Sequence, residues 1–110
     1  MSTGFFYVAA PYSEAVDKDM RWRDITHHTA NLIKMGMNCY SPITHGHPMA
    51  GTIGEKPIEF WLALDMPFLE AAKGILVLKF DGWEESLGVK AEIEVAKKAG
   101  KLVIYQDVKG

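Results

Sequence analysis

Two carboxylates occupy positions where helical periodicity favours apolar side chains. Glu92 lies on the core-facing side of a helix predicted over residues 88–99. The apolar residues of that side follow the i, i+4, i+7 spacing and are Val89, Ile93 and Ala96. Asp65 interrupts the apolar side of a second helix, predicted over residues 57–72, in the same way. A buried carboxylate must be paired, be protonated or face a cleft, because burying an unpaired charge is costly. Two such groups with different pKa values are typical of glycosidic bond cleavage, in which one acts as nucleophile and the other as acid.

Each carboxylate also has a simpler interpretation. Glu92, which we place in the first turn of its helix, could reach water at the edge of the apolar side or cap the helix. Pro67 removes one helical hydrogen bond and crowds the carbonyl of Ala63, so we expect a kink that could turn Asp65 outward. The predicted apolar side of this helix comprises Ile58, Trp61, Leu62, Phe68, Leu69 and Ala72.

The elements that must position these residues alternate along the chain. The same pattern occurs three times: a helical segment, then a glycine, then a short β-rich run. The glycines are Gly36, Gly74 and Gly100, and each is predicted to end its helix in the left-handed conformation. Phe5–Ala10 is an apolar run typical of a strand buried on both faces of a parallel sheet. We therefore predict one α/β domain over residues 1–110, a flavodoxin/Rossmann-like three-layer sandwich with a four-stranded parallel sheet. The predicted strands cover residues 4–10, 37–40, 74–80 and 101–106, and the third predicted helix covers residues 14–35.

Ligands of open parallel sheets bind beyond the carboxyl ends of the strands. In this chain those ends lead into Ala9–Ser13, Ser41–His47 and Phe80–Gly88, which are rich in polar and turn-forming residues. Ser41–Lys56 shows no usable period and is predicted to be a long loop. A loop of that length in so small a domain is more often functional than idle.

The composition restricts the function classes. The 110 residues have a net charge of −2, which argues against a nucleic-acid binder. The single Cys39 excludes a disulfide framework and a multi-cysteine metal cluster, and it fits a reducing compartment. No apolar run is long enough to span a bilayer, and no signal peptide is visible. We therefore expect a cytoplasmic protein with neither a membrane nor a nucleic-acid partner.

His45 and His47 form an H-x-H motif in the predicted loop. No cysteine or carboxylate has the spacing of further metal ligands, so we expect no metal site and no cofactor. Either histidine could contact a phosphate or a base, or both could be solvated. Trp83 could stack on a base or pack its loop against the core.

Three motifs lie in register with the predicted elements. Tyr7–Tyr12 reads Y-V-A-A-P-Y, Asp65 stands eight residues before Lys73, and Gly82–Glu92 reads G-W-E-E-S-L-G-V-K-A-E. Together these motifs cover most of the chain. Through them the chain resembles the nucleoside 2-deoxyribosyltransferase-like superfamily. This superfamily includes 2'-deoxynucleoside 5'-monophosphate N-glycosidases.

The resemblance implies a role for each matching residue. It implies that Glu92 is a nucleophile that attacks C1' of the deoxyribose and forms a glycosyl-enzyme intermediate. It implies that Asp65 contacts the departing base, and that Tyr7 orients the nucleophile and lines the sugar pocket. Gly88 is then expected to let the amides at the helix start approach a 5' oxygen or phosphate.

Ser86 bears on the choice of substrate that the resemblance implies. Transferases of the superfamily often carry Asp at this position, whereas the monophosphate glycosidases carry Ser. A neutral hydroxyl tolerates a phosphate, so we expect hydrolysis of a nucleoside monophosphate rather than base exchange. Ser13 could add a second phosphate contact, although either serine could simply be an N-cap. The full set of predicted substrate-binding residues is Ala10, Pro11, Tyr12, Ser13, His45, His47, Trp83, Ser86 and Gly88.

The chain also departs from the superfamily pattern. Lys73 stands where relatives commonly have Asp, and larger members add a fifth strand and a C-terminal segment. We expect a homodimer or homotetramer, because association would bury apolar helix surface and cover the site. Two alternatives to an enzyme remain: a non-catalytic nucleotide-binding module, or a structural subunit of an oligomer.

Overall fold

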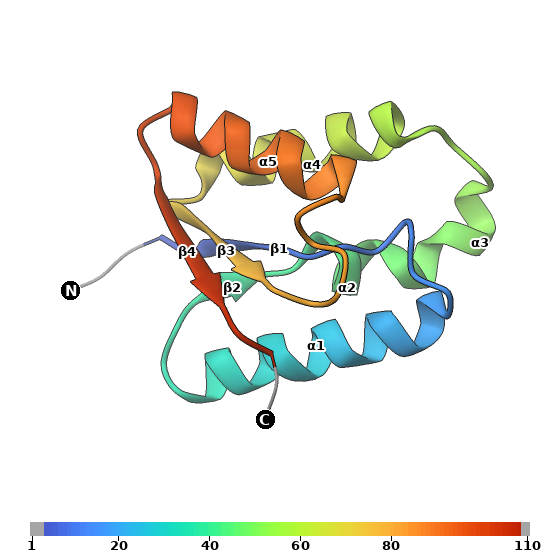
Figure 1. Ribbon diagram of the computed structural model, residues 1–110, viewed down its shortest axis with the longest axis horizontal. Coiled ribbons are helices and arrows are strands. Elements are labelled where there is room, and N and C mark those ends of the chain that lie inside the picture. Colours follow the sequence, from blue (N-terminus) through green and yellow to red (C-terminus); the bar gives the residue numbers. More distant parts are fainter. Residues whose placement is uncertain (1–3, 109–110) are drawn as a thin grey trace.

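A parallel sheet forms the centre of the computed structural model, which describes residues 4–108 (Figure 1). Within these residues the sheet has the strand order β2-β1-β3-β4, and all neighbouring strands are parallel. The strands are β1 (Phe6–Ala9), β2 (Cys39–Tyr40), β3 (Gly74–Leu78) and β4 (Leu102–Gln106). This arrangement confirms the predicted α/β fold with a four-stranded parallel sheet.

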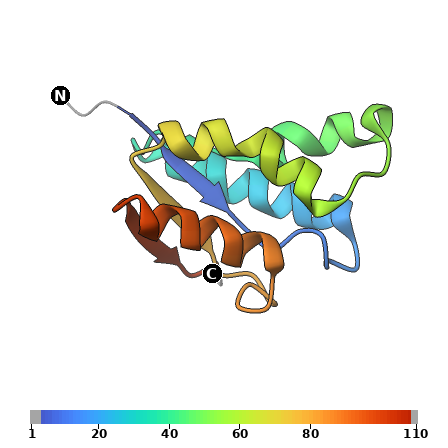
Figure 2. The ribbon, with the colours of Figure 1, turned by 90° about the horizontal axis from the view of Figure 1, so that it is seen from above.

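Helices cover both faces of the sheet. The helices α4 (Ile58–Ala71) and α5 (Leu87–Lys98) lie side by side on one face, and α1 (Lys18–Lys34) covers the other (Figures 1 and 2). Because side chains alternate along a strand, β1 and β3 supply both cores and are buried throughout. The core under α4 and α5 contains Tyr7, Ala9, Leu69, Ala72, Ile75, Val77, Val89 and Ala96. The core under α1 contains Phe6, Val8, Ala10, Ile25, Leu32, Leu76 and Leu78.

The segment predicted as a long loop is largely helical, so that prediction is wrong. It contains α2 (Pro42–Gly46), the 3-10 helix η1 (His47–Met49) and α3 (Ala50–Ile53). The side-chain oxygen of Ser41 accepts a hydrogen bond from the backbone N–H of Thr44 at 3.1 Å and so caps α2. Helices of three to five residues are too short to show a hydrophobic period, which explains why the pattern did not reveal them.

The three glycines predicted to end helices do not behave alike. Gly36 and Gly100 follow α1 and α5 with φ of 101° and 71°, as predicted. Gly74 is instead the first residue of β3 and is outside the positive-φ region. A Cβ at this position would lie 2.8 Å from both the carbonyl oxygen of Leu102 and the ring of Phe6. Close packing between strands, not a helix end, requires this glycine.

The helix ends also differ from the predicted ones. α1 begins at Lys18 rather than at residue 14, because the carboxylate of Asp17 accepts a hydrogen bond from the N–H of Met20 and caps the helix. α4 continues through Pro67 to Ala71.

Among the described residues, no helix has the length and apolarity that crossing a membrane requires.

The predicted apolar side of α4 is partly wrong. Leu69 and Ala72 are buried, whereas Phe68 is 38% exposed and lies on the outer side of the helix. Lys101, the residue before β4, stabilises the end of α4, because its ammonium group donates hydrogen bonds to the carbonyl oxygens of Glu70 and Ala72 at 3.0 and 2.7 Å.

Candidate active site

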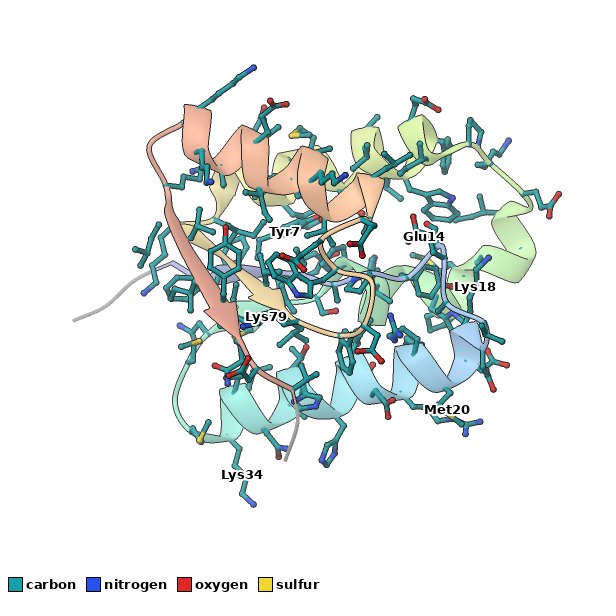
Figure 3. All side chains as sticks on the ribbon, viewed as in Figure 1. Tyr7, Glu14, Lys18, Met20, Lys34 and Lys79 are labelled. Atoms are coloured by element: carbon teal, nitrogen blue, oxygen red, sulfur yellow. The ribbon has the colours of Figure 1, made fainter. Side chains whose placement is uncertain are left out.

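Tyr7 and Glu92 form a hydrogen-bonded pair between the sheet and α5. The Tyr7 hydroxyl donates to Oε2 of Glu92, and both residues are buried. Tyr7 comes from the middle of β1 and lies among the side chains packed under α4 and α5 (Figure 3). Glu92 lies in the second turn of α5, since that helix begins at Leu87, so its predicted place in the first turn is wrong. Its predicted place on the core-facing side is confirmed.

Burial makes the proton on each of these groups hard to remove. Burial raises the pKa of Glu92 from 4.5 to about 8; the hydrogen bond from Tyr7 opposes this rise, and the charge of Asp65 adds to it. The pKa of Tyr7 is raised well above its usual range, first by burial and then by the negative charge of Glu92. Strongly perturbed groups of this kind are concentrated at functional sites.

Asp65 is the second carboxylate of the same site. Burial raises its pKa from 3.8 to about 6, and the nearby His45 opposes the rise. The negative charge of Asp65 in turn raises the pKa values of Tyr7, Tyr40 and Glu92. Asp65 is therefore partly buried, and its charge acts on the Tyr7–Glu92 pair.

Tyr40 joins this site although it was not among the predicted residues. It is the last residue of β2 and pairs in register with Tyr7 of β1. Its ring stacks on Phe68 at a centroid distance of 4.5 Å and lies 6.0 Å from the ring of His45. An aromatic residue that ends a strand next to β1 is the sequence signal that could have identified it.

A second cluster links the loop after β1 to α1 and η1. The Tyr12 hydroxyl lies 2.6 Å from Nδ1 of His47, whose Nε2 lies 2.7 Å from a carboxylate oxygen of Asp19. The His47 ring also stacks on Trp22 at 4.8 Å. The predicted residues Tyr12 and His47 are therefore brought together, whereas the ring of His45 lies near that of Tyr40. Asp19 and Trp22 were missed because nothing in the local pattern of α1 marks them.

The start of α5 carries two further predicted residues. Ser86 is the N-cap of this helix, and its hydroxyl accepts a hydrogen bond from the N–H of Val89 at 3.3 Å. A Cβ at Gly88 would make only ordinary contacts, at 3.8 Å with Ile58 and 3.9 Å with Ser86, so packing does not require a glycine here. Trp83 packs against the core, with its ring 5.5 Å from that of Tyr105.

The remaining predicted residues lie in the segment after β1. Ala10 and Pro11 are buried, and the carbonyl oxygen of Pro11 accepts a hydrogen bond from Arg21 at 2.6 Å. Ser13 is exposed in a turn closed by a hydrogen bond from the N–H of Ala15 to the carbonyl of Tyr12. It does not cap α1, since that role belongs to Asp17.

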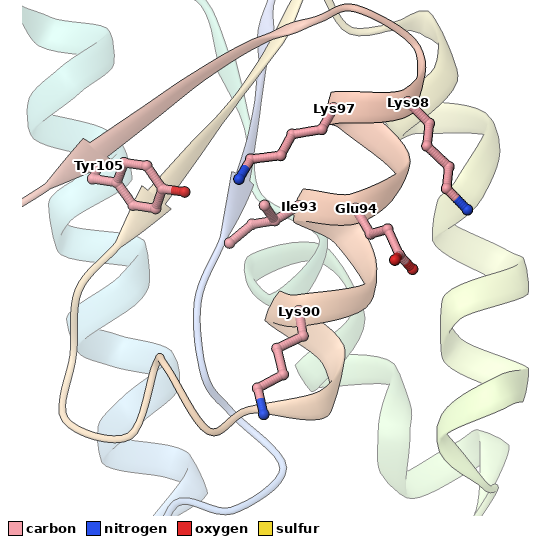
Figure 4. A pocket seen from close by; sticks show the side chains of 6 residues that line it. All are labelled: Lys90, Ile93, Glu94, Lys97, Lys98 and Tyr105. Atoms are coloured by element: carbon pink, nitrogen blue, oxygen red, sulfur yellow. The ribbon is translucent and has the colours of Figure 1, made fainter.

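Within residues 4–108 no three His, Cys, Asp or Glu residues are grouped so as to hold a metal ion. A depression lies on the outer side of α5 toward β4, and it includes none of the predicted site residues (Figure 4). It is lined by Lys90, Ile93, Glu94, Lys97, Lys98 and Tyr105.

Comparison with known proteins places the chain in a family. No curated protein is similar to the chain at a significant level. The model of a family described as a domain of unknown function, DUF1937, matches residues 4–107 and so spans the whole sheet and both carboxylates. The chain therefore belongs to the DUF1937 family.

Proposed function

We propose that this protein cleaves the N-glycosidic bond of a 2'-deoxynucleoside or of its 5'-monophosphate, with Glu92 as nucleophile. The observation that carries the proposal is the buried hydrogen bond between Tyr7 and Glu92, with Asp65 close enough to perturb both groups. Two carboxylates in such an arrangement can act as nucleophile and acid on either side of a scissile bond. The single Cys39 fits the reducing cytoplasm, where we propose that the protein acts.

The reaction has two steps that conserve atoms and charge. In the first, a carboxylate oxygen of Glu92 attacks C1' while Tyr7 holds the other oxygen. The bond between C1' and the base nitrogen breaks, its electron pair goes to the base, and Asp65 supplies the proton. In the second step Asp65 removes a proton from a water molecule, which attacks C1' and releases Glu92. Another base in place of water would make the protein a transferase.

The two pKa values determine how this activity depends on pH. Between about pH 6 and pH 8 the pair formed by Asp65 and Glu92 holds one proton, which lies mainly on Glu92 in the free protein. The reactive form is the minor one with the same number of protons, in which Glu92 is ionised and Asp65 carries the proton. Below this window both groups are protonated and the nucleophile is lost; above it both are ionised and the acid is lost. We expect a bell-shaped profile of kcat/KM with limbs near pH 6 and pH 8. In Asp65→Asn the alkaline limb should disappear, because only Glu92 then titrates.

The 5' end of the substrate is placed by the start of α5. Ser86 carries no charge, and the first amides of a helix have no partners within it, so this region suits a phosphate better than a carboxylate would. Packing within the chain does not explain Gly88, which leaves close approach of a ligand as its reason. We therefore favour the monophosphate over the free nucleoside.

The test is incubation of the protein with a panel of deoxynucleosides and their 5'-monophosphates, with free base followed by chromatography. We expect base release that is abolished in Glu92→Gln and retained in Glu94→Gln, which changes an exposed carboxylate of the same helix. A 2'-deoxy-2'-fluoro nucleotide should leave an adduct on the peptide that contains Glu92, measured by mass spectrometry.

Two outcomes would contradict the proposal. Nucleotide binding without base release, at every pH between 5 and 9, would indicate a non-catalytic binding module. Base release that survives in Glu92→Gln would show that another group is the nucleophile.

A further inference from the structure

Arg21 of α1 lies where the strand order of the sheet reverses. In the order β2-β1-β3-β4 the chain goes from β1 to β2 on one side and then crosses to β3 on the other, so the reversal falls between β1 and β3. Ligands of open parallel sheets bind at this point. The guanidinium group contacts the segments that follow both strands. Its Nη1 donates a hydrogen bond to the carbonyl oxygen of Pro11 at 2.6 Å, and its Cζ lies 5.0 Å from the ring centre of Phe80.

No carboxylate neutralises Arg21 among the residues that the structure describes. Arg21 is half-buried, and the ion pairs found in this range join His47 to Asp19 and Lys79 to Asp107. A carbonyl oxygen and an aromatic ring stabilise a cation, but neither carries the opposite charge. Because a half-buried charge without an opposite charge is costly, an anion bound from solution would complete this site.

Two carboxylates at helical spacing from Arg21 do not serve as its partners. Asp17 and Asp24 stand four residues before it and three residues after it, at spacings from which helical ion pairs form. Asp17 instead caps α1 through the hydrogen bond that it accepts from Met20, and within residues 4–108 no ion pair joins Asp24 to Arg21. The guanidinium is directed toward the edge of the sheet. One of its five N–H donors makes the bond to Pro11, which leaves donors for the oxygens of an anion.

The loop after β3 links Phe80 to the start of α5. The N–H of Trp83 donates to the carbonyl of Phe80 at 3.0 Å, and the N–H of Ser86 donates to the carbonyl of Gly82 at 3.1 Å. These two turns make the loop compact, with Arg21 at its first residue and the proposed 5' site at its last. The carboxylates of the loop are exposed, so solvent and salt screen their charge. They are Asp81, Glu84 and Glu85.

We propose that Arg21 binds the 5'-phosphate of the substrate and makes the monophosphate a better substrate than the free nucleoside. The bond to Pro11 fixes the guanidinium, and its remaining N–H groups donate to two phosphate oxygens, as arginine does when it binds phosphate. One cation and the uncharged hydroxyl of Ser86 then allow a chain of net charge −2 to hold a dianion. The identity of the ligand rests on the proposed function, whereas the anion site rests on the contacts of Arg21 alone.

Binding of 2-deoxyribose 5-phosphate tests the proposal without turnover, because this compound carries the phosphate but no base. We expect it to bind in a nuclear magnetic resonance titration, and 2-deoxyribose to bind far more weakly. Arg21→Met should weaken the affinity for 2-deoxyribose 5-phosphate by about ten- to hundredfold, because it removes charge-assisted hydrogen bonds. Arg23→Met is the matched control and should leave this affinity unchanged, since Arg23 is exposed on the same helix.

A second variant keeps the test decisive if Arg21→Met does not fold, which circular dichroism shows. Arg21→Lys keeps the charge and a donor for Pro11 but loses the forked arrangement of N–H groups. It should therefore weaken the affinity for 2-deoxyribose 5-phosphate several-fold, less than Arg21→Met does.

Turnover separates phosphate binding from a purely structural role of Arg21. We expect Arg21→Met to lower kcat/KM by about ten- to hundredfold for the monophosphates and to change it little for the free nucleosides. A residue that only held the loop after β1 in place would lower both alike, and this result would overturn the proposal. So would a protein that does not bind 2-deoxyribose 5-phosphate, or an affinity that both Arg21 variants leave unchanged. Absence of base release from every substrate would instead contradict the proposed function, while Arg21-dependent binding of 2-deoxyribose 5-phosphate would still support the anion site.

Discussion

Replacing Glu92 by Gln tests the electrostatics of the candidate site without any substrate. The variant keeps the shape of the side chain and an oxygen that can accept the hydrogen bond from Tyr7, but it can no longer ionise. The pKa of Glu92 is raised to about 8 in the folded protein, first by burial. The folded protein therefore binds this proton more tightly than the unfolded chain does, in which the group has its ordinary pKa.

The sign and size of the effect follow from linkage. Below the unfolded pKa of 4.5 the group is protonated in both states and its stabilising contribution is complete. As pH rises, the unfolded chain ionises first, and the contribution is lost until the folded group also ionises near pH 8. At about 1.4 kcal/mol per unit of pKa, the loss is about 5 kcal/mol. This is a large share of the roughly 5–15 kcal/mol by which small domains are stable.

Urea unfolding of the two proteins between pH 4 and pH 9 provides the measurement. We expect Glu92→Gln to match the unmodified protein near pH 4 and to become more stable by about 5 kcal/mol above pH 8. Glu94→Gln is the matched control and should follow the unmodified protein at every pH, since Glu94 is exposed on the same helix. If the difference between Glu92→Gln and the unmodified protein does not change with pH, Glu92 is not held in its protonated form and the reasoning fails.

Three other contacts make predictions that can be measured in the same way or by hydrogen exchange. Ser86→Ala removes the cap of α5 and should lower the free energy of unfolding by about 1 kcal/mol in urea. Lys101→Met removes both hydrogen bonds to the end of α4 and should cost about 1–2 kcal/mol. His47→Phe keeps a ring that can stack on Trp22 but loses both hydrogen bonds, so amide exchange should become faster in the segment around Tyr12; unchanged exchange would show that the cluster does not hold this loop.

Several features of the protein could be predicted from local sequence alone. The alternation of helical and apolar segments identified the parallel sheet, because a strand buried on both faces must be apolar throughout. The helical period placed Glu92 on the core-facing side of α5, and the structure confirms it. The same reasoning found Asp65, since a carboxylate in an apolar pattern stands out without knowledge of its partners.

What the sequence left undecided depends on contacts between distant segments. The hydrogen bond between Tyr7 and Glu92 joins residues 85 positions apart, and the link from His47 to Asp19 joins a 3-10 helix to α1. Gly74 has the same local context as the helix-ending glycines, yet its reason is the closeness of Leu102 and Phe6 in space.

The periodicity of α4 shows the same division most clearly. Its composition determined that the helix is apolar on more than one side, but only the packing decided which side faces the sheet. Leu69 and Ala72 are buried against the sheet, while Phe60, Leu64 and Phe68 remain outside. The sequence by itself thus determined the four strands, the three long helices and the two carboxylates, because these depend on neighbours along the chain. The tertiary structure decided their pKa values and the exposed apolar face, because burial is a property of the folded chain as a whole.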